Sequence, residues 1–521
     1  MCIRDSIFGP QGIYSNPGGE GVNWERPCSV EYILPDGSKG FQIDCGIRIL
    51  GGASRNANIP KHSFRLLFKS DYGRPKLKYG LFEGSPVSSF DTLVLRANYN
   101  NSWVHWDGGQ RRRAMLIRDQ FAKDTTLDMG QPGTYGRFVN LYVGGLYWGV
   151  FNLVERPSAS FAADHMGGEK EEWDALNSGN AIDGNGTAWG QVQSAAAAVG
   201  TDGARLSGLR NQLDIENLVD YLLMNYYGGN HDWDSHNWYS ARHRVEGGQW
   251  RFFSWDAERI LEGIGDSRLN VNQGNAPTGI HNRLRNNPEY RLIFADRIHR
   301  HFFNGGALTP AATAARFLRR ANEVEVAVAS ESARWGDYRR DVHQWRNGPY
   351  EFYRPDSHWL VEKNRLLATY FPRRSEQVLR TLTSAGLYPR ISAPVFSQGG
   401  GLVAPGFGLA MTRPAGQQGE IYYTLDGSDP RVPVSGEVSA AAVRYSAAVS
   451  ISDYTIVKAR LRSGVQWSAL NEAVFTLPPA YDSLHISELM YHPPGGREFE
   501  FIELENSGEL TIDLAGLEYT N

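Results

Sequence analysis

The sequence contains few cysteines, few lysines and no long apolar run. Its 521 residues include three Cys, which is too few for a disulfide-rich scaffold or a cysteine-based zinc site. No apolar run approaches the roughly 20 residues that a membrane-spanning helix needs, so we expect no membrane span in this stretch. Lys and Arg number 53 against 57 Asp and Glu, and this near balance argues against a general nucleic-acid-binding protein.

The scarce residues still carry information. Only nine of the 53 cations are Lys, so a Lys at a chemically useful position is easily noticed. Cys28 and Cys45 could form a disulfide or could be small buried side chains. We favour the second interpretation, because three cysteines do not indicate an oxidising compartment.

The composition otherwise predicts a folded α+β protein of several domains. Hydrophobic residues make up 41%, and no low-complexity tract occurs. At roughly 150 residues per domain the length suggests three to four domains. Changes of pattern divide the chain into five parts: a leader at 1–23, a mixed domain at 24–388, a β domain at 389–477, a linker at 478–483 and an unfinished β domain at 484–521.

Both ends differ from those expected of a complete protein. The letters MCIRDS resemble a translated sequencing adaptor and lack the apolar core of a signal peptide, so we expect the leader to be partly non-native. The other end stops within a strand-like pattern. We therefore treat the sequence as a fragment, in which a missing export signal carries little information.

Periodicity predicts the main elements of the mixed domain. A helix from 214 to 227 has Asp214 as its N-cap, one apolar face, and Gly228-Gly229 at its end. Two later helical stretches, 310–333 and 358–382, form a helical end-piece. Alternating residues predict two pairs of strands joined by Gly- or Asn-rich turns, at 41–50 with 62–68 and at 138–141 with 148–154.

The segment after the glycine pair contains the strongest chemical pattern. Asp232 and Asn237 stand in an Asp-x-x-x-x-Asn spacing, by which a kinase catalytic loop places a base and a metal-binding amide. An aromatic strand follows and ends at Trp255-Asp256. A carboxylate there can complete an oxygen shell for Mg²⁺, which keeps waters and phosphate oxygens as further ligands. By itself the spacing is also typical of a turn cluster, because Asp and Asn favour loops.

A glycine-rich hairpin precedes this loop in the chain. Gly51-Gly52 and the following Ser54 and Arg55 can bring backbone N–H groups close to phosphates, and Lys61 can reach them as a point charge. Glu155 ends the second strand of the hairpin at 138–154. This carboxylate could hold Lys61 in place, or it could cap the strand in solvent.

Two further groups are less specific. His299 and His301 could bind a metal, but at i and i+2 of a helix they diverge, so a solvated face is favoured. Arg111, Arg112 and Arg113 are interpreted as a solvated helix start. No nucleophile elbow, Walker loop or His-Glu-x-x-His motif occurs.

These elements occur along the chain in the order found in a kinase: glycine-rich hairpin, Lys, Glu, Asp-x-x-x-x-Asn and strand-end Asp. The chain resembles the spore-coat protein H (CotH) kinase-like family over about 350 residues. The residues that carry the resemblance are Pro60–Ser63, Leu116–Asp119, Tyr142–Glu155, Gly229–Asn237 and Trp255-Asp256.

The resemblance implies an atypical protein-kinase-like fold that uses ATP and Mg²⁺. It implies Asp232 as the catalytic-loop Asp, with Asn237 and Asp256 as magnesium ligands. Lys61 would neutralise nucleotide phosphate, and Glu155 would line the nucleotide side of the cleft, with Ser54, Arg55 and Trp255 as further cofactor-binding candidates. Family members often carry Arg-Gly before the loop Ser, whereas this chain has Leu50-Gly51, and Arg48 or Arg55 could substitute.

The later parts of the chain resemble accessory modules. Tyr422–Pro430 is similar to a signature of the β-sandwich at the C-terminus of chitobiase-type enzymes, which predicts an immunoglobulin-like sandwich. Ile486–Tyr491 and Glu500–Asn506 resemble the start of a lamin-tail domain, of which only the first third is present. Such modules suggest a secreted or cell-surface protein.

Three functional hypotheses follow. The leading one is an ATP- and Mg²⁺-dependent kinase acting on Ser or Thr of exported or cell-envelope proteins, with a Ser-rich protein as substrate. The alternative is a surface adhesion or scaffold protein, whose kinase-like module binds a surface protein or glycan without turnover. A metal-dependent hydrolase using Asp232, Asp234 and Asp256 explains neither Lys61 nor the domain order. None of the three involves nucleic acid.

Overall fold

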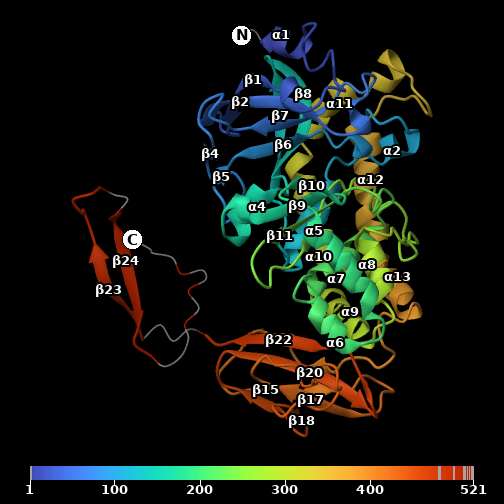
Figure 1. The fold of residues 1–521 in the computed structure, drawn as a ribbon, viewed down its shortest axis with the longest axis vertical. Helices are drawn as coiled ribbons and strands as arrows, with labels where there is room; N and C mark the ends of the chain where they lie inside the picture. Colours follow the sequence, from blue (N-terminus) through green and yellow to red (C-terminus); the bar gives the residue numbers. More distant parts are fainter. Residues whose placement is uncertain are drawn as a thin grey trace. The chain divides into compact units, whose positions relative to one another are not determined.

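The computed structural model describes residues 3–478, 483–496 and 499–508, with positions 512, 514 and 517 beyond them. It divides into two compact units, Met1–Tyr388 and Pro389–Asn521, which are considered separately here (Figure 1). Most of the expected linker at 478–483, and most of the expected last domain after 508, lie outside the described residues. The first unit is mixed α and β, and the second is rich in β structure.

A large antiparallel sheet forms the beginning of the first unit. Its strand order is β1-β2-β3-β6-β8-β7, so the hairpins predicted at 41–68 and 138–154 are confirmed. A short separate pair consists of β4 (Leu77–Lys78) and β5 (Ser89–Phe90). The strands of the large sheet are β1 (Arg26–Ile33), β2 (Lys39–Leu50), β3 (Ser63–Leu67), β6 (Thr92–Arg96), β7 (Gly136–Val143) and β8 (Leu146–Val154).

The two faces of the large sheet bury different residues. One face carries Phe64, Leu66 and Leu95 into one apolar cluster, and the alternate positions Val94 and Val154 enter another. This division follows from the period-2 alternation of a strand. The second cluster includes residues of a small sheet, so this side of the large sheet, called the site face below, packs toward it.

The small sheet has the order β10-β9-β11-β12. Its strands are β9 (Trp173–Asn177), β10 (Asn180–Asp183), β11 (Trp238–His243) and β12 (Arg251–Ser254). The helices of this region and of the connection before it are α2 (Gly108–Arg112), α3 (Arg118–Asp128), α4 (Ala159–Met166), α5 (Thr187–Val199), α6 (Gly203–Leu209), α7 (Ile215–Gly228), α8 (Pro277–Leu284) and α9 (Pro288–Phe302).

Helix α7 has the ends that the sequence predicts. The Asp214 carboxylate accepts a hydrogen bond from Asn217 N at 2.9 Å, which makes it the N-cap. Gly229 ends the helix with φ +64°, a left-handed conformation that glycine adopts without steric cost. The helix is buried along almost its whole length, so it fixes the position of the loop that follows.

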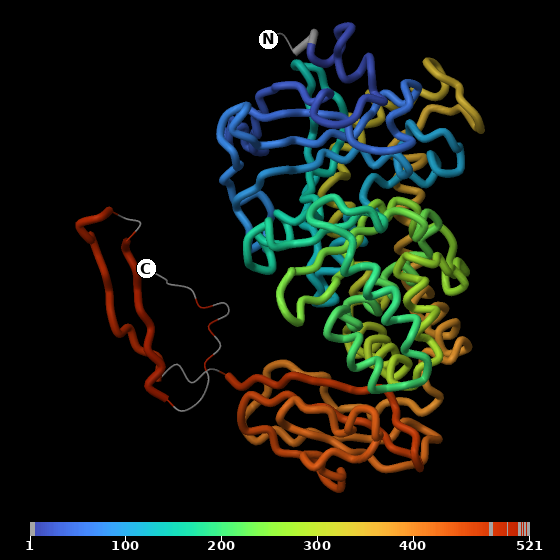
Figure 2. The backbone as a smooth tube through the Cα atoms, in the orientation of Figure 1, coloured from blue at the N-terminus to red at the C-terminus, as the bar shows by residue number. Residues whose placement is uncertain are grey.

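The late helices contact the strands at the beginning of the domain as well as one another. Those of the predicted end-piece are α10 (Pro310–Val324), α11 (Ala327–Trp335), α12 (Leu360–Arg365) and α13 (Phe371–Ser384), with short π-helical stretches beside the last two. Figure 2 shows the yellow segment of α11 returning to the blue strands, and α11 contacts β8. Within the described ranges, no helix combines the length and apolar composition needed to cross a membrane.

The leader from Ile7 onward packs on the domain. After α1 (Ile3–Phe8), Ile13 is buried in the cluster under the large sheet. The Tyr14 hydroxyl accepts a hydrogen bond from Trp148 Nε1 at 2.6 Å. These contacts join residues 7–14 to β8.

The second unit has its own apolar core. A buried ion pair explains the Asp in the Tyr422–Pro430 motif. After β17, the Asp429 carboxylate takes two hydrogen bonds from the buried Arg460, at 2.8 and 2.6 Å. A separate antiparallel pair consists of β23 (Leu484–Met490) and β24 (Phe501–Asn506). The other strands are β13 (Val395–Phe396), β14 (Gly401–Leu402), β15 (Phe407–Leu409), β16 (Met411–Thr412), β17 (Glu420–Thr424), β18 (Val443–Arg444), β19 (Val449–Ile451), β20 (Thr455–Ser463), β21 (Gln466–Trp467) and β22 (Asn471–Thr476).

Candidate functional site

The loop after α7 is fixed to the segment that follows β12. The Leu261 amide donates to the Gly228 carbonyl at 2.8 Å, and the His231 amide donates to the Arg259 carbonyl at 2.9 Å. These two backbone bonds place Asp232 next to the chain that leaves Asp256.

The pairing of β11 with β12 brings Asn237 and Asp256 to one end of the small sheet. Trp238 is opposite Ser254, so the residues just before Trp238 and just after Ser254 leave the ribbon together. Asn237 and Asp256 both adopt left-handed backbone conformations, with φ +66° and +60°. Asn and Asp tolerate this region better than most residues. The predicted metal-binding pair is therefore brought together.

Asp232 is held within the loop and remains partly exposed. Its carboxylate lies 3.0 Å from His236 Nε2, and it accepts a hydrogen bond from Asn237 Nδ2 at 3.2 Å. Its side chain is 33% exposed, which leaves it accessible to a ligand from solvent. Asn237 Nδ2 also bonds the Asp232 carbonyl at 2.9 Å, so the two ends of the Asp-x-x-x-x-Asn motif are in direct contact.

Arg96, at the end of β6, joins Asp256 to helix α3. Its guanidinium pairs with Asp256, with Glu258 at 2.6 Å and with Asp119 of α3 at 3.1 Å. Glu258 also accepts a hydrogen bond from the Asn100 amide at 2.6 Å. Kinases contain a comparable pair between a cation on a strand and a carboxylate on a helix.

Buried charge shifts the pKa values of these carboxylates in opposite directions. Burial raises the pKa of Glu258 to about 8, and the nearby Asp256 adds to this against the effect of Arg96. Burial also acts to raise the pKa of Asp119, but Arg96 and Lys123 outweigh it and hold that pKa below its usual value. Asp119 therefore favours its anionic form, whereas Glu258 favours its protonated form more than an exposed glutamate does.

Two aromatic rings lie beneath these cations. Arg96 and Lys123 lie over the Trp255 ring, at 4.9 and 4.7 Å from its centroid. The Trp255 ring lies 5.2 Å from that of Tyr239, over which Arg156 is placed at 5.8 Å. Trp255 thus supports the cations from below through cation–π contacts.

Three arginines gather on the site face of the large sheet. Arg48 is directly opposite Arg65 across the β2–β3 pair, and like charges in such positions repel. Burial, with the repulsion of Arg156 and Arg48, lowers the pKa of Arg65 to about 10. The Arg156 Nε is buried without a hydrogen-bond partner in the described chain. An anion placed between these side chains would relieve the repulsion.

Lys61 does not occupy the position that the sequence predicts. Its Nζ is fully buried and pairs with Glu331 of α11 at 2.6 Å, and it also bonds the Val150 carbonyl at 2.8 Å. Gly149 has φ +122°, and a Cβ there would come within 2.5 Å of the Glu331 carboxylate. Lys61 is therefore a buried structural cation that joins β8 to α11, and the expected point charge in the cleft is corrected.

Glu155 follows neither of its two predicted alternatives. Its carboxylate is buried, lies 2.7 Å from His165 Nε2, and accepts a hydrogen bond from the Tyr135 amide at 2.9 Å. It neither contacts Lys61 nor caps the strand in solvent. It fixes the start of the connection between β8 and α4.

Arg55 holds the glycine-rich loop itself. Its guanidinium donates to the carbonyls of Ile49 at 2.7 Å and Gly51 at 2.6 Å, and to two carbonyls of the leader. The Ser54 carbonyl lies 2.8 Å from His62 Nδ1. The apolar Leu50 packs against the cluster that contains Trp255, so Arg48 is the arginine of β2 on the site face.

The hydrolase hypothesis loses one of its three carboxylates. Asp234 is buried and accepts hydrogen bonds from Thr278 N and Oγ1 at 2.9 and 2.8 Å, which ties it to the start of α8. Burial raises its pKa to about 6. Among the described residues, no three His, Cys, Asp or Glu side chains form a group that could hold a metal ion.

Although no group of three such side chains is present in the described residues, the two oxygen donors of Asn237 and Asp256 fit Mg²⁺. In the described part of the chain, Asn237 Oδ1 and Asp256 Oδ2 make no hydrogen bond, so two oxygen donors remain at the same end of the ribbon. Mg²⁺ is commonly bound by one or two protein oxygens together with waters and substrate phosphates.

A protein-family comparison matches residues 47–352 to the model described as CotH kinase protein, which is more than half of the chain. The chain belongs to the CotH kinase protein family. Residues 411–468 match a second family, described as Fn3 associated. Among curated proteins, no match was found. Every side chain of the site described above lies within the CotH match.

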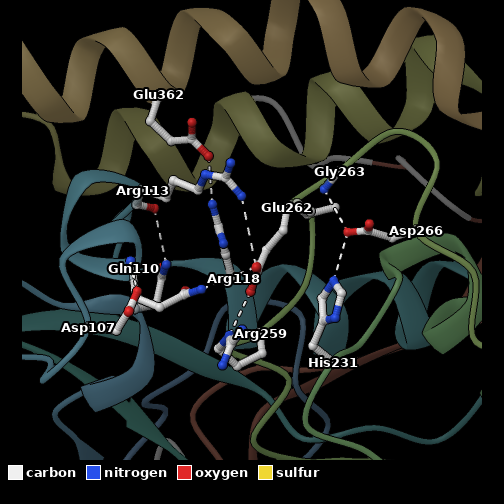
Figure 3. A network of polar contacts seen from close by, with 12 residues as sticks. Asp107, Gln110, Arg113, Arg118, His231, Arg259, Glu262, Gly263, Asp266 and Glu362 are labelled. Atoms are coloured by element: carbon white, nitrogen blue, oxygen red, sulfur yellow. Dashed lines mark hydrogen bonds and ion pairs between the residues drawn. The ribbon is translucent and has the colours of Figure 1, made fainter. Parts of the chain in front are cut away.

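The loop that contains Asp232 in this CotH domain is connected to α2 by polar contacts (Figure 3). His231 Nε2 lies 2.8 Å from Asp266, which also accepts from the Gly263 amide at 2.7 Å. Next to Gly263, Glu262 pairs with Arg259 at 2.6 Å. Gln110 of α2 donates to Glu262 at 3.1 Å. A separate pair, between the buried Arg118 of α3 and Glu362 at 2.6 Å, joins α3 to α12.

Sequence reasoning missed Arg96, Asp119, Lys123 and Glu258. One signal was present, because Arg96 ends a strand of otherwise apolar and small residues, Thr92–Leu95, where a charge needs a partner. Asp119 lies within a segment that carried the CotH resemblance. The pairing between them depends on a contact that no local pattern encodes.

Proposed function

We propose that residues 24–388 form an ATP- and Mg²⁺-dependent protein kinase that acts on Ser or Thr of exported or cell-envelope proteins. Membership of the CotH family supports a kinase-like function. The observation that carries the proposal is the meeting of Asn237 and Asp256 at one end of the small sheet, with Arg96 linking Asp256 to Asp119.

Each side chain has a role in this proposal. Asp232 would orient the acceptor hydroxyl and accept its hydrogen bond, while Asn237 and Asp256 would hold the metal. Arg48, Arg65 and Arg156 would neutralise nucleotide phosphate on the site face. When bound, Mg²⁺ and ATP supply the phosphoryl group and the charge neutralisation that phosphoryl transfer requires. Lys61 and Glu155 have no place in it, because both are buried in other pairs.

Transfer of labelled phosphate tests the proposal. The purified chain is incubated with labelled ATP, Mg²⁺ and a Ser-rich protein, and Asp232→Asn and Asp256→Asn are measured beside it. We expect each variant to lose at least about a hundredfold in rate, because positioning and charge stabilisation supply most of the catalysis in this reaction. Equal transfer by wild type and Asp232→Asn would refute it.

A kinase-like binding module without turnover is the second candidate. The Arg96–Asp256 pair favours it, because Arg96 occupies one oxygen of the proposed metal ligand. The three arginines favour it as well, because an anion alone, without a metal ion, would relieve their repulsion. The Tm measured with and without ATP and Mg²⁺ shows whether the protein has a nucleotide site, which both the kinase and this binding module would have. A ligand at 100 times its Kd adds about 2.7 kcal/mol to stability. Stabilisation without phosphate transfer would indicate this module.

For the rest of the chain we propose the following organisation. The residues at 389–477 are an immunoglobulin-like accessory sandwich of the chitobiase C-terminal type, and those at 484–521 begin a lamin-tail domain. The β-rich second unit and the Fn3-associated match support an accessory role. We place the protein outside the cell or at its surface, where Ser-rich proteins, other surface proteins or glycans would be its partners. Detecting the chain in culture medium or on intact cells tests this location.

A further inference from the structure

A large groove with a positive lining lies beside strands β2, β3 and β6 of the large sheet. Asp232, Asn237 and Asp256 are not among its lining residues, and it shares only Arg65 with the three arginines described above. It encloses about 1010 Å³ and is lined by six cations and two carboxylates, Asp71 and Asp91. The whole chain, in contrast, has a net charge of −4. Four of its nine lysines lie here. The six cations are Arg65, Lys69, Arg74, Lys76, Lys78 and Lys170.

The cations come from both sides of the groove. Most belong to β3, β4 and the connection between them, whereas Lys170 follows α4. Figure 1 shows the β4–β5 pair between β2 and α4. The floor includes the apolar side chains of Ile43 and Leu67. The groove therefore combines an apolar floor with cations from two separate segments.

The internal carboxylates neutralise only part of this charge. Lys69 pairs with the buried Glu25 at 2.7 Å, Lys76 with Asp164 at 3.4 Å, and Lys170 with the exposed Glu171 at 3.7 Å.

Two further cations remain without such a partner. Within the described residues, the side chains of Arg74 and Lys78 form no ion pair or hydrogen bond. The groove thus keeps a positive excess that an external anion can meet.

We propose that this groove binds an acidic peptide segment of a protein partner. The charges are spread over four segments and are carried mainly by long lysine side chains. A ligand with carboxylates spaced along an extended chain matches this distribution better than a compact polyphosphate does. A polyphosphate needs cations close enough to repel one another, as Arg48 and Arg156 repel Arg65. The apolar floor offers contact for the stems of the acidic side chains.

Binding of a labelled peptide tests the proposal. The full chain is titrated, without nucleotide, into a fluorescein-labelled peptide of ten glutamates, and anisotropy gives the Kd. We expect the combined variant Arg74→Ala, Lys78→Ala and Lys170→Ala to bind about tenfold more weakly, since exposed ion pairs contribute about 0.2–1 kcal/mol each. Raising the salt from about 50 to 200 mM should weaken wild-type binding, because salt screens exposed charge.

A matched control removes the same charge elsewhere. Arg205→Ala, Arg319→Ala and Arg380→Ala replace exposed arginines of α6, α10 and α13, and should leave the Kd unchanged. Equal urea midpoints for both triple variants exclude unfolding as the cause. Asp256→Asn should bind the peptide like wild type, so loss of kinase activity and loss of this site are distinguishable.

Three outcomes overturn the proposal. One is an unchanged Kd in the groove variant, and another is an equal loss in the control variant. The third is tighter binding of a sulfated heparin hexasaccharide or a ten-nucleotide single strand than of the peptide, lost in the groove variant. That result would assign the groove to a glycan or a nucleic acid.

Discussion

Arg96 lies between three carboxylates from different segments, Asp119, Asp256 and Glu258. It is buried, and its pairing with these groups holds its pKa well above the usual value although burial acts against it. A buried ion pair adds little to stability relative to apolar residues, but removal of one partner leaves the others uncompensated. Arg96 is therefore required for the fold as well as for the site.

Replacement of Arg96 should be strongly destabilising. We expect Arg96→Met to lower the free energy of unfolding by about 3–5 kcal/mol, because Asp119 and Glu258 remain buried without their shared cation. Urea unfolding followed by tryptophan fluorescence measures the loss. Adding Glu258→Gln to Arg96→Met should change the loss little, since burial already favours the uncharged form of the Glu258 carboxyl once Arg96 is removed. An unchanged urea midpoint in Arg96→Met would contradict this account.

The cysteine pair leads to a second prediction at this scale. Cys28 and Cys45 are directly opposite in the β1–β2 register, and their Sγ atoms lie 3.5 Å apart without a bond. The hydrogen bond that the Cys45 thiol makes with Cys28, together with burial, raises the pKa of Cys45, so the reactive thiolate is scarce.

We expect diamide to join the two cysteines slowly into an intramolecular disulfide. Peptide mass mapping without reductant detects the product, and Cys28→Ser is the control. Separate alkylation of both thiols with no cross-link under diamide would argue against the geometry.

At the scale of elements, the buried Lys61–Glu331 pair connects β8 to α11. Glu331 also accepts a hydrogen bond from the Val150 amide at 2.7 Å, so its carboxylate serves both Lys61 and the strand. Burial lowers the pKa of Lys61 in spite of Glu331.

We expect Glu331→Ala to destabilise the protein by about 3–5 kcal/mol, because it strands a buried ammonium. Glu323→Ala, on the exposed side of α10, is the control and should cost less than about 1 kcal/mol. Chemical denaturation of both variants measures the difference. A small effect of Glu331→Ala would mean that α11 is not anchored by this pair.

The N-cap of α7 allows a finer test. We expect Asp214→Ala to cost about 1 kcal/mol, since the Asn217 amide loses its acceptor. Asp214→Asn should cost less, because an amide oxygen can still accept that bond, although the ion pair with Arg251 at 3.0 Å is lost. Urea midpoints rank the variants. The reverse order would show that the ion pair, and not the cap, is the important contact.

At the scale of the whole molecule, three buried histidines make stability depend on pH. Burial lowers the pKa of His62 to about 4, and those of His105 and His281 to about 3. Their unfolded values lie near 6.5, so the unfolded chain binds more protons between these limits. The stability they provide is complete above pH 6.5 and is lost as the pH falls toward 3.

We therefore expect the Tm to fall as the pH is lowered from 6.5 to 4. His281→Gln should show a smaller slope over this range, because it removes one group that takes up a proton on unfolding. Asp234 acts in the opposite direction, since its raised pKa favours the folded state at low pH. Scanning calorimetry at several pH values gives the slopes. An identical slope in His281→Gln would contradict the assignment.

Features that depend on residues close together in the sequence could be predicted, whereas contacts between distant residues could not. Helix α7, its cap and its glycine end were predicted, because each signal lies within a few residues of the next. The partner of Lys61 lies 270 residues away, so no local spacing could reveal it. For the same reason Arg96 was missed.

The other differences between prediction and structure concern polar side chains that were expected in solvent and are buried. His299 and His301 were expected on a solvated face, but both are buried, with His301 placed 3.0 Å from Asp220. Arg111 is fully buried as well, and donates to Tyr353 and to the distant carbonyls of Asn347 and Pro349. A polar residue in a helix looks exposed in sequence until the rest of the fold supplies its partners.

The left-handed backbone at Asn237 and Asp256 limits how this site can change during evolution. A β-branched or bulky residue is disfavoured at either position by sterics alone, whatever its chemistry. Gly, Asn and Asp are the residues that such positions accept most readily. Relatives that have lost phosphoryl transfer should therefore carry Asn or Gly where this chain has Asp256, and this signature would separate binding modules from kinases within the family.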